Sequence, residues 1–158
     1  MIYIKYILIV IGLSLSNLIA SDYDIGDIVN QNDQEQRFTI CNGDFFNNDL
    51  KLSYLNGDVN GGHYFVSWFD ISATWWPACK TLAEGPVGSV ENEWEDNPNV
   101  VIFTSLSDLN QPYSCSQWGN LGNGSNEPLI IHDPNYEFMG WFGCCGSSEG
   151  WPSTVFLD

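Results

Sequence analysis

Residues 63 to 80 decide the fold: His63-Tyr-Phe-Val-Ser-Trp-Phe-Asp-Ile-Ser-Ala-Thr-Trp-Trp-Pro-Ala-Cys-Lys80. The first half, up to Ile71, is almost continuously aromatic and β-branched, which predicts a buried central strand. The second half turns through Trp75-Trp76-Pro77-Ala78-Cys79-Lys80 into a predicted helix from Ala78 to about Glu95. We expect an interruption of this helix at Gly85-Pro86, because proline removes a backbone donor.

Apolar runs of strand length alternate with helical patterns along the rest of the chain. Tyr113 to Leu121 predicts a helix with Ser114 as its N-cap, and residues 21–60 predict an irregular, polar lead-in with one or two short strands. This alternation predicts an α/β domain with a mostly parallel or mixed sheet flanked by helices. The other expected strands are Phe38–Ile40, Leu50–Tyr54, Val100–Leu106, Pro128–Ile131 and Thr154–Leu157.

The N-terminus has the pattern of an export signal. One positive charge at Lys5 precedes an apolar run from Ile7 to Leu13, and a small residue stands at Ala20. This pattern predicts a signal peptide over residues 1–20, cut between Ala20 and Ser21. The alternative is an uncleaved membrane anchor, for which the apolar run is short. We therefore expect an exported protein, periplasmic or secreted.

The charge balance is strongly acidic, with 20 Asp and Glu residues against four Lys and Arg and a net charge of −16. Such a field argues against nucleic acid and against an anionic membrane surface as partners. The chain has five cysteines. Disulfides are permissible in an exported chain, and an odd number leaves at least one cysteine outside intrachain pairs.

Three segments together resemble the exported thioredoxin-like redoxins, the TlpA-type and alkyl hydroperoxide reductase/thiol-specific antioxidant group. In that family the motif is Ala-Thr-Trp-Cys-x-x-Cys, similar to Ala73–Cys79, and the next helix carries a Glu-x-Pro kink, similar to Glu84-Gly-Pro86. Gly150–Asp158 resembles the segment Gly-x-Pro-x-Thr-x-x-x-Asp, whose proline is cis. Ile25-Gly-Asp-Ile28 resembles the opening phrase. The resemblance implies a thioredoxin-like domain over residues 61–158.

The chain departs from that family in two places. Trp76 stands where the family has its attacking cysteine, so the active site is a degenerate Trp-x-x-Cys. Family members also continue past the position of Asp158 with another strand and a closing helix. We expect a fragmentary gene model or a truncated reading frame, which leaves the Thr154–Leu157 strand as an open edge. The alternative is a dimer or a partner that covers this edge.

Cys79 is the candidate reactive thiol. A two-cysteine cycle needs an attacking and a resolving sulfur, and only the second position of the motif carries one. Because Cys79 opens a helix and adjoins Lys80, its pKa could be lowered, so that it forms mixed disulfides or a sulfenic acid. The alternative, which we prefer, is an inert cysteine buried under Trp75 and Trp76.

The remaining cysteines offer two roles. The glycine-flanked pair Cys144 and Cys145 is the candidate resolving thiol for Cys79, or a partner of a structural disulfide. Cys41 and Cys115 lie in turn-like surroundings and are candidates for a structural disulfide, although connectivity does not follow from sequence.

Substrate binding is assigned to Trp75, Trp76, Pro77 and Pro152, as the resemblance implies. His63 and His132 show no metal-ligand spacing, so we expect no metal and no cofactor. The function expected is that of a redoxin acting on protein thiols and disulfides, or on a partner redox protein, with its activity lost or rerouted through Cys79. The alternative is a non-catalytic binding module that holds extracytoplasmic clients in the groove beside Pro152.

Overall fold

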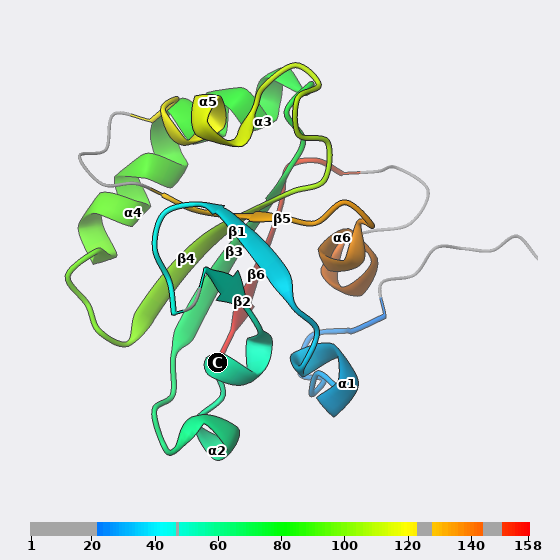
Figure 1. Ribbon diagram of the computed structural model, residues 1–158, viewed down its shortest axis with the longest axis vertical. Coiled ribbons are helices and arrows are strands. Elements are labelled where there is room, and N and C mark those ends of the chain that lie inside the picture. The colour runs from blue at the N-terminus through cyan, green and yellow to red at the C-terminus, as the bar shows by residue number, and fades with distance from the viewer. Residues whose placement is uncertain (1–21, 47, 123–127, 144–149) are drawn as a thin grey trace, which may run out of the picture.

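A mixed β-sheet forms the centre of the molecule (Figure 1). The computed structural model describes residues 22–46, 48–122, 128–143 and 150–158, and within them the sheet has six strands in the order β2-β1-β5-β4-β3-β6. β3, β4 and β5 are parallel, while β6 and β1 pair antiparallel with the central strands. The strands are β1 (Phe38–Asn42), β2 (Asp49–Leu50), β3 (Val66–Ser72), β4 (Val100–Leu106), β5 (Leu129–His132) and β6 (Ser153–Leu157).

Helices flank both faces of this sheet, with α3, α4 and α5 gathered on one side and α1 and α6 on the other (Figure 1). The expected fold class, α/β with a mixed sheet flanked by helices, is thereby confirmed. The helices are α1 (Gln31–Gln34), the 3₁₀ turn η2 (Leu52–Tyr54), α2 (Gly57–Asn60), α3 (Pro77–Leu82), η3 (Ala83–Val87), α4 (Gly88–Trp94), α5 (Cys115–Gly119) and α6 (Glu137–Phe142).

The segment after the motif continues through its proline. η3 is a π-helical turn that contains Pro86, and it joins α3 to α4. A π-turn accommodates an inserted residue and a missing donor without ending the helix. The predicted helix is therefore confirmed in its extent, and the predicted interruption at Pro86 takes the form of this turn.

Each face of the sheet has its own apolar cluster, because side chains alternate along a strand. Phe69 and Ile71 of β3 pack on the α6 side with Phe138. On the α3 side, Leu106 and Ile130 pack with Cys79, Trp118 and Ala73. Asp70 and Ser72 alternate with Phe69 and Ile71, and they therefore point to the same side of the sheet as Cys79.

The lead-in contributes to the sheet and to the core. Phe38 of β1 and Leu50 of β2 are buried in the α6-side cluster, together with Leu52 and Leu55. Two short helices, α1 and α2, were not expected from the sequence. Both are single turns that begin at an asparagine cap, Asn30 and Asn56, and such a turn has too few apolar residues to show periodicity.

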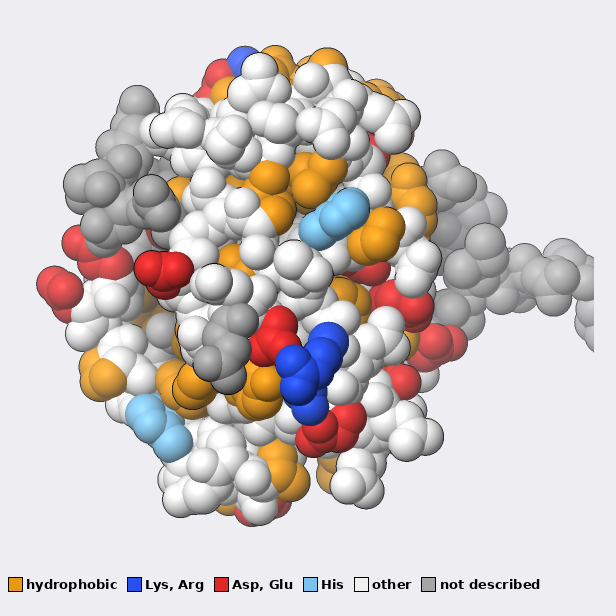
Figure 2. Space-filling view, viewed as in Figure 1, with side chains coloured by type: hydrophobic (Ala, Val, Ile, Leu, Met, Phe, Trp, Pro, Cys, Tyr) orange, Lys and Arg blue, Asp and Glu red, His pale blue; other side chains and the backbone are white. Residues whose placement is uncertain are grey.

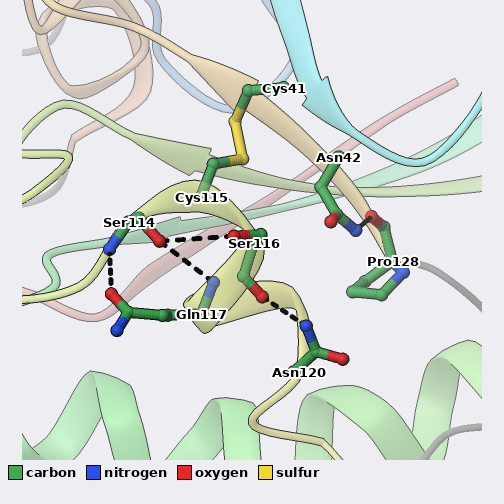
Figure 3. Close-up of a disulfide and its surroundings, with 8 residues drawn as sticks. All are labelled: Cys41, Asn42, Ser114, Cys115, Ser116, Gln117, Asn120 and Pro128. Atoms are coloured by element: carbon green, nitrogen blue, oxygen red, sulfur yellow. Dashed lines mark hydrogen bonds between the residues drawn. A yellow bond between two sulfur atoms is a disulfide. The ribbon is translucent and has the colours of Figure 1, made fainter.

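A disulfide joins β1 to α5, with Cys41 bonded to Cys115 across a Cα–Cα distance of 6.0 Å (Figure 3). The predicted bridge is confirmed. Ser114 caps α5 as expected: its hydroxyl accepts from the backbone N–H of Gln117, whose side chain accepts from the N–H of Ser114. Beside the bridge, Asn42 donates to the carbonyl of Pro128 at 2.8 Å, which fixes the approach to β5.

Some of the sequence predictions fall outside the residues described. These are the signal peptide over residues 1–20 and the cysteine pair Cys144 and Cys145. In the described ranges, no helix combines the length and the apolar character that a membrane crossing needs.

Candidate functional site

The motif begins where β3 ends, at the carboxyl edge of the parallel strands. Ser72 is the last residue of β3, and α3 starts at Pro77 with Trp76 as its N-cap residue. Proline suits this first helical position, because its missing N–H has no partner to lose. Cys79 therefore lies in the first turn of α3, as the sequence predicts.

Asp108 holds the loop between β3 and α3. Its buried carboxylate accepts hydrogen bonds from the backbone N–H of Thr74, at 2.8 and 2.9 Å, and from the N–H of Trp75 at 3.2 Å. The Thr74 hydroxyl adds a bond of 2.8 Å to the same carboxylate. Hydrogen bonds to a charged acceptor are stronger than neutral ones. The segment after β4 thus sets the position of the motif.

Cys79 has no exposed surface. Its Sγ accepts a long hydrogen bond, 3.4 Å, from the N–H of Ala73. Burial raises the pKa of the Cys79 thiol, and the negative charges of Asp70 and Asp108 add to the increase, which outweighs the hydrogen bonds from Ala73 and Ser72. The expected lowering of this pKa is therefore wrong: desolvation of the thiolate exceeds what the start of a short helix supplies.

The expected help from Lys80 is also absent, because Lys80 pairs with Glu84 one turn along the helix. The burial of Cys79 that the preferred hypothesis expects is confirmed, whereas its inertness stays a prediction. The side chain packs in the α3-side cluster with Leu106, Trp118 and Ile130.

A second buried acid lies on the same side of the sheet. Asp70 is fully buried, and its Oδ2 accepts a 2.6 Å hydrogen bond from the Ser72 hydroxyl. Its Oδ1 has no hydrogen-bond partner among the described residues. Desolvation raises the pKa of Asp70 to about 6, which the Ser72 bond only partly opposes.

Exposed aromatic rings cover the surface around the motif. Trp75 is 52% exposed, Trp76 41% and Tyr136 44%. Trp75 contacts Trp76 and Trp151 at ring-centroid distances of 5.3 and 5.8 Å, and Trp151 contacts Tyr136 at 6.3 Å. We call these four residues the motif face. A joined set of exposed large rings is unusual on a soluble surface and indicates an interaction site.

The motif face brings together segments far apart in the sequence. Trp151 and Pro152 come from the entry to β6, and the peptide bond between them is cis, as the resemblance implies. Trp141 of α6 does not line this surface, because it is buried in the α6-side cluster. Tyr136, which precedes α6, lies there instead.

The described cysteines give Cys79 no partner. Cys41 and Cys115 form a disulfide with each other, and Cys79 is the free cysteine of the described ranges. The proposed resolving pair, Cys144 and Cys145, lies outside them.

Sequence reasoning missed two carboxylates that shape the site. Asp108 follows β4, and Asp133 follows β5, where it accepts 2.9 Å hydrogen bonds from the N–H groups of Glu137 and Phe138 at the start of α6. Both aspartates directly follow predicted buried strands, and the ends of parallel strands meet at one edge of the sheet. This position in the sequence could have identified them as residues of the site.

Comparisons with known proteins give one similarity of shape. No family model matches the chain, and no curated protein matches it. Among solved structures, the chain is similar to the pneumococcal exposed lipoprotein thioredoxin of Streptococcus pneumoniae strain TIGR4, with a TM-score of 0.48 and 16% identity. The similarity covers 70% of this chain and 73% of the other. A likeness of this size says nothing about which residues act.

Proposed function

We propose that this chain is an exported, thioredoxin-like binding module of the redoxin type that has lost the thiol cycle and uses the motif face to hold extended polypeptide segments. The observation that carries the proposal is a contrast within the motif. Its tryptophans, Trp75 and Trp76, are exposed, whereas its cysteine is fully buried with a raised pKa.

Thiol exchange requires a thiolate that can reach its substrate. An unperturbed cysteine has only a few per cent thiolate at pH 7, and the raised pKa of Cys79 reduces this fraction further. A substrate sulfur would also have to displace the packing of Leu106 and Trp118 to touch Sγ. Both conditions oppose turnover at Cys79.

The motif face meets the needs of binding instead. Tryptophan and tyrosine supply large contact areas at small cost in side-chain entropy, and they dominate the energetics of protein interfaces. Asp108 fixes the loop that carries Trp75, so binding a ligand should cost little additional conformational entropy of the backbone.

The proposed location outside the cytoplasm rests on the charged, apolar and small residues of the first twenty positions and on the Cys41–Cys115 bridge, which needs an oxidising compartment. Mass spectrometry of the exported product tests it, with Ser21 as the expected first residue.

Binding is tested with fluorescent, cysteine-free extended peptides, monitored by anisotropy. Replacing Trp75 by alanine should weaken binding about tenfold, as for a central aromatic contact. The matched control is Phe156→Ala, because Phe156 is also exposed (69%) but lies in β6 and belongs to neither the motif face nor the cleft. Equal effects of the two substitutions, or binding confined to cysteine-containing peptides, would overturn the proposal.

A further inference from the structure

A cleft of about 350 Å³ lies away from the motif, between α4, the start of β4 and the segment after β1. A volume of this size suits a small molecule. Three aromatic residues from separate segments line the cleft, namely Phe45, Phe65 and Trp94. None of the four motif-face residues lines it.

The charged groups of the cleft all have the same sign. Asp44, Glu91 and Glu95 are lining residues, and no lysine, arginine or histidine is among them. The described basic side chains are engaged elsewhere: Arg37 pairs with Asp49, Lys51 with Glu35 and Lys80 with Glu84. On the face drawn in Figure 2, blue side chains accordingly lie against red ones. The residues that line the cleft therefore include three acidic side chains and no basic one.

Glu91 gives this field a focus. Its Oε1 is buried and has no hydrogen-bond partner among the described residues. An unpaired buried carboxylate oxygen is costly, and a positive charge placed nearby relieves the cost. Aromatic walls favour the same ligand, because ring faces attract cations, above all ammonium groups with apolar substituents.

We propose that this cleft binds a small organic cation, an ammonium group on an apolar body. The apolar body packs against Phe45, Phe65 and Trp94, and the ammonium group lies on the side of Glu91. The same chemistry is available from a free amine and from a lysine side chain of a peptide, and the experiment separates these two sources.

The ionisation of Glu91 supports the assignment. Desolvation, followed by the charge of Asp70, raises the pKa of Glu91 to about 7. The other charged residues that line the cleft, Asp44 and Glu95, are also acidic. A bound cation favours the ionised form, so binding should lower this pKa and should strengthen as pH rises from 6 to 8.

The experiment titrates the full mature protein with phenethylammonium, followed by ¹H–¹⁵N NMR. The neutral 2-phenylethanol tests the need for charge, and a lysine-containing peptide tests the second source. We expect shifts centred on the Trp94 indole and affinity at least tenfold above that for the alcohol. A stronger response to the peptide would identify the lysine side chain as the source.

Paired variants separate this site from the general negative charge and from the motif face. Glu91→Gln should weaken binding at least tenfold, whereas Glu93→Gln, an equal charge change at an exposed residue of α4 outside the cleft, should change it less than twofold. Trp94→Ala should weaken amine binding, and Trp75→Ala should leave it unchanged. Equal effects of the two glutamate variants, shifts centred on Trp75 and Trp76, or no saturable shift would each overturn the proposal.

Discussion

The motif face and the cleft both contain aromatic rings, but the buried carboxylates near them differ in how completely they are hydrogen-bonded. At the motif face, Asp108 accepts hydrogen bonds from Thr74 and Trp75 with both carboxylate oxygens. On the α4 side of the sheet, Asp70 and Glu91 each keep one buried oxygen without a partner in the described ranges.

This difference suggests a structural role for Asp108 and a ligand-binding role for Glu91. A carboxylate with all its hydrogen bonds fixes the backbone and leaves no charge for a ligand to neutralise. We therefore expect the proposed binding at the motif face to depend on contacts with its aromatic rings. An unsatisfied carboxylate stores an unfavourable energy that a proton or a cation can remove. The cleft should therefore respond to charge and pH, and the motif face should not.

The largest effect on stability should come from removing the Cys41–Cys115 disulfide, because it joins residues that are 74 positions apart in the sequence. Replacing both with alanine frees the unfolded chain, and we expect a loss of about 4 kcal/mol in the free energy of unfolding. Urea denaturation measures it. A loss below about 1 kcal/mol would show that the bridge contributes little to stability.

The next effect should come from Asp108. Its replacement by alanine leaves the buried N–H of Thr74 without its acceptor, and it also removes the bond to Trp75, at a cost of about 3 kcal/mol. The exposed Asp96→Ala is the control and should change stability by less than about 0.5 kcal/mol. Similar values for the two variants would remove Asp108 from its role at the motif face.

A smaller, pH-dependent effect should appear at Asp70. Its pKa is raised from 3.8 to about 6, so stability is highest while both folded and unfolded states are protonated and falls as pH rises through this window. Asp70→Asn should abolish this fall and should raise stability at pH 8 by at most about 3 kcal/mol, the free energy that corresponds to the shift of the Asp70 pKa. Denaturation curves between pH 4 and 8 measure it.

The same variant also tests the coupling between the two acids. Removing the charge of Asp70 should lower the pKa of Glu91 from about 7, which side-chain NMR can follow. An unchanged pH profile together with an unchanged Glu91 titration would contradict the unpaired state of this pair.

The sequence predicts the elements with the strongest patterns. The predicted strand Val100–Leu106 has the same bounds as β4, because a short, continuous apolar run is typical of a buried strand. The β3 strand starts at Val66 rather than His63, since aromatic and β-branched content alone does not mark where pairing begins. Ser114 was identified as a cap because the capping interaction is local.

The site was less accessible to sequence reasoning. The motif and Pro152 could be named, but the pKa of Cys79 could not, because it depends on burial against Leu106 and Trp118 from distant segments. Tyr136 and Asp108 join the site through tertiary approach alone. The cleft could not be predicted from the sequence for the same reason, because segments near β1, β3 and α4 that are far apart in the chain form its walls.

The decisive measurement is the accessibility of the Cys79 thiol in the folded protein. The purified protein is alkylated at pH 7 to 9, and each cysteine-containing peptide is quantified by mass spectrometry over time. We expect Cys79 to stay unlabelled in the native state, with a labelling rate that rises only as denaturant unfolds the protein. Rapid native labelling of Cys79 at neutral pH, or its reversible appearance in a disulfide with Cys144 or Cys145, would show that Cys79 is a reactive thiol and would favour a redox function.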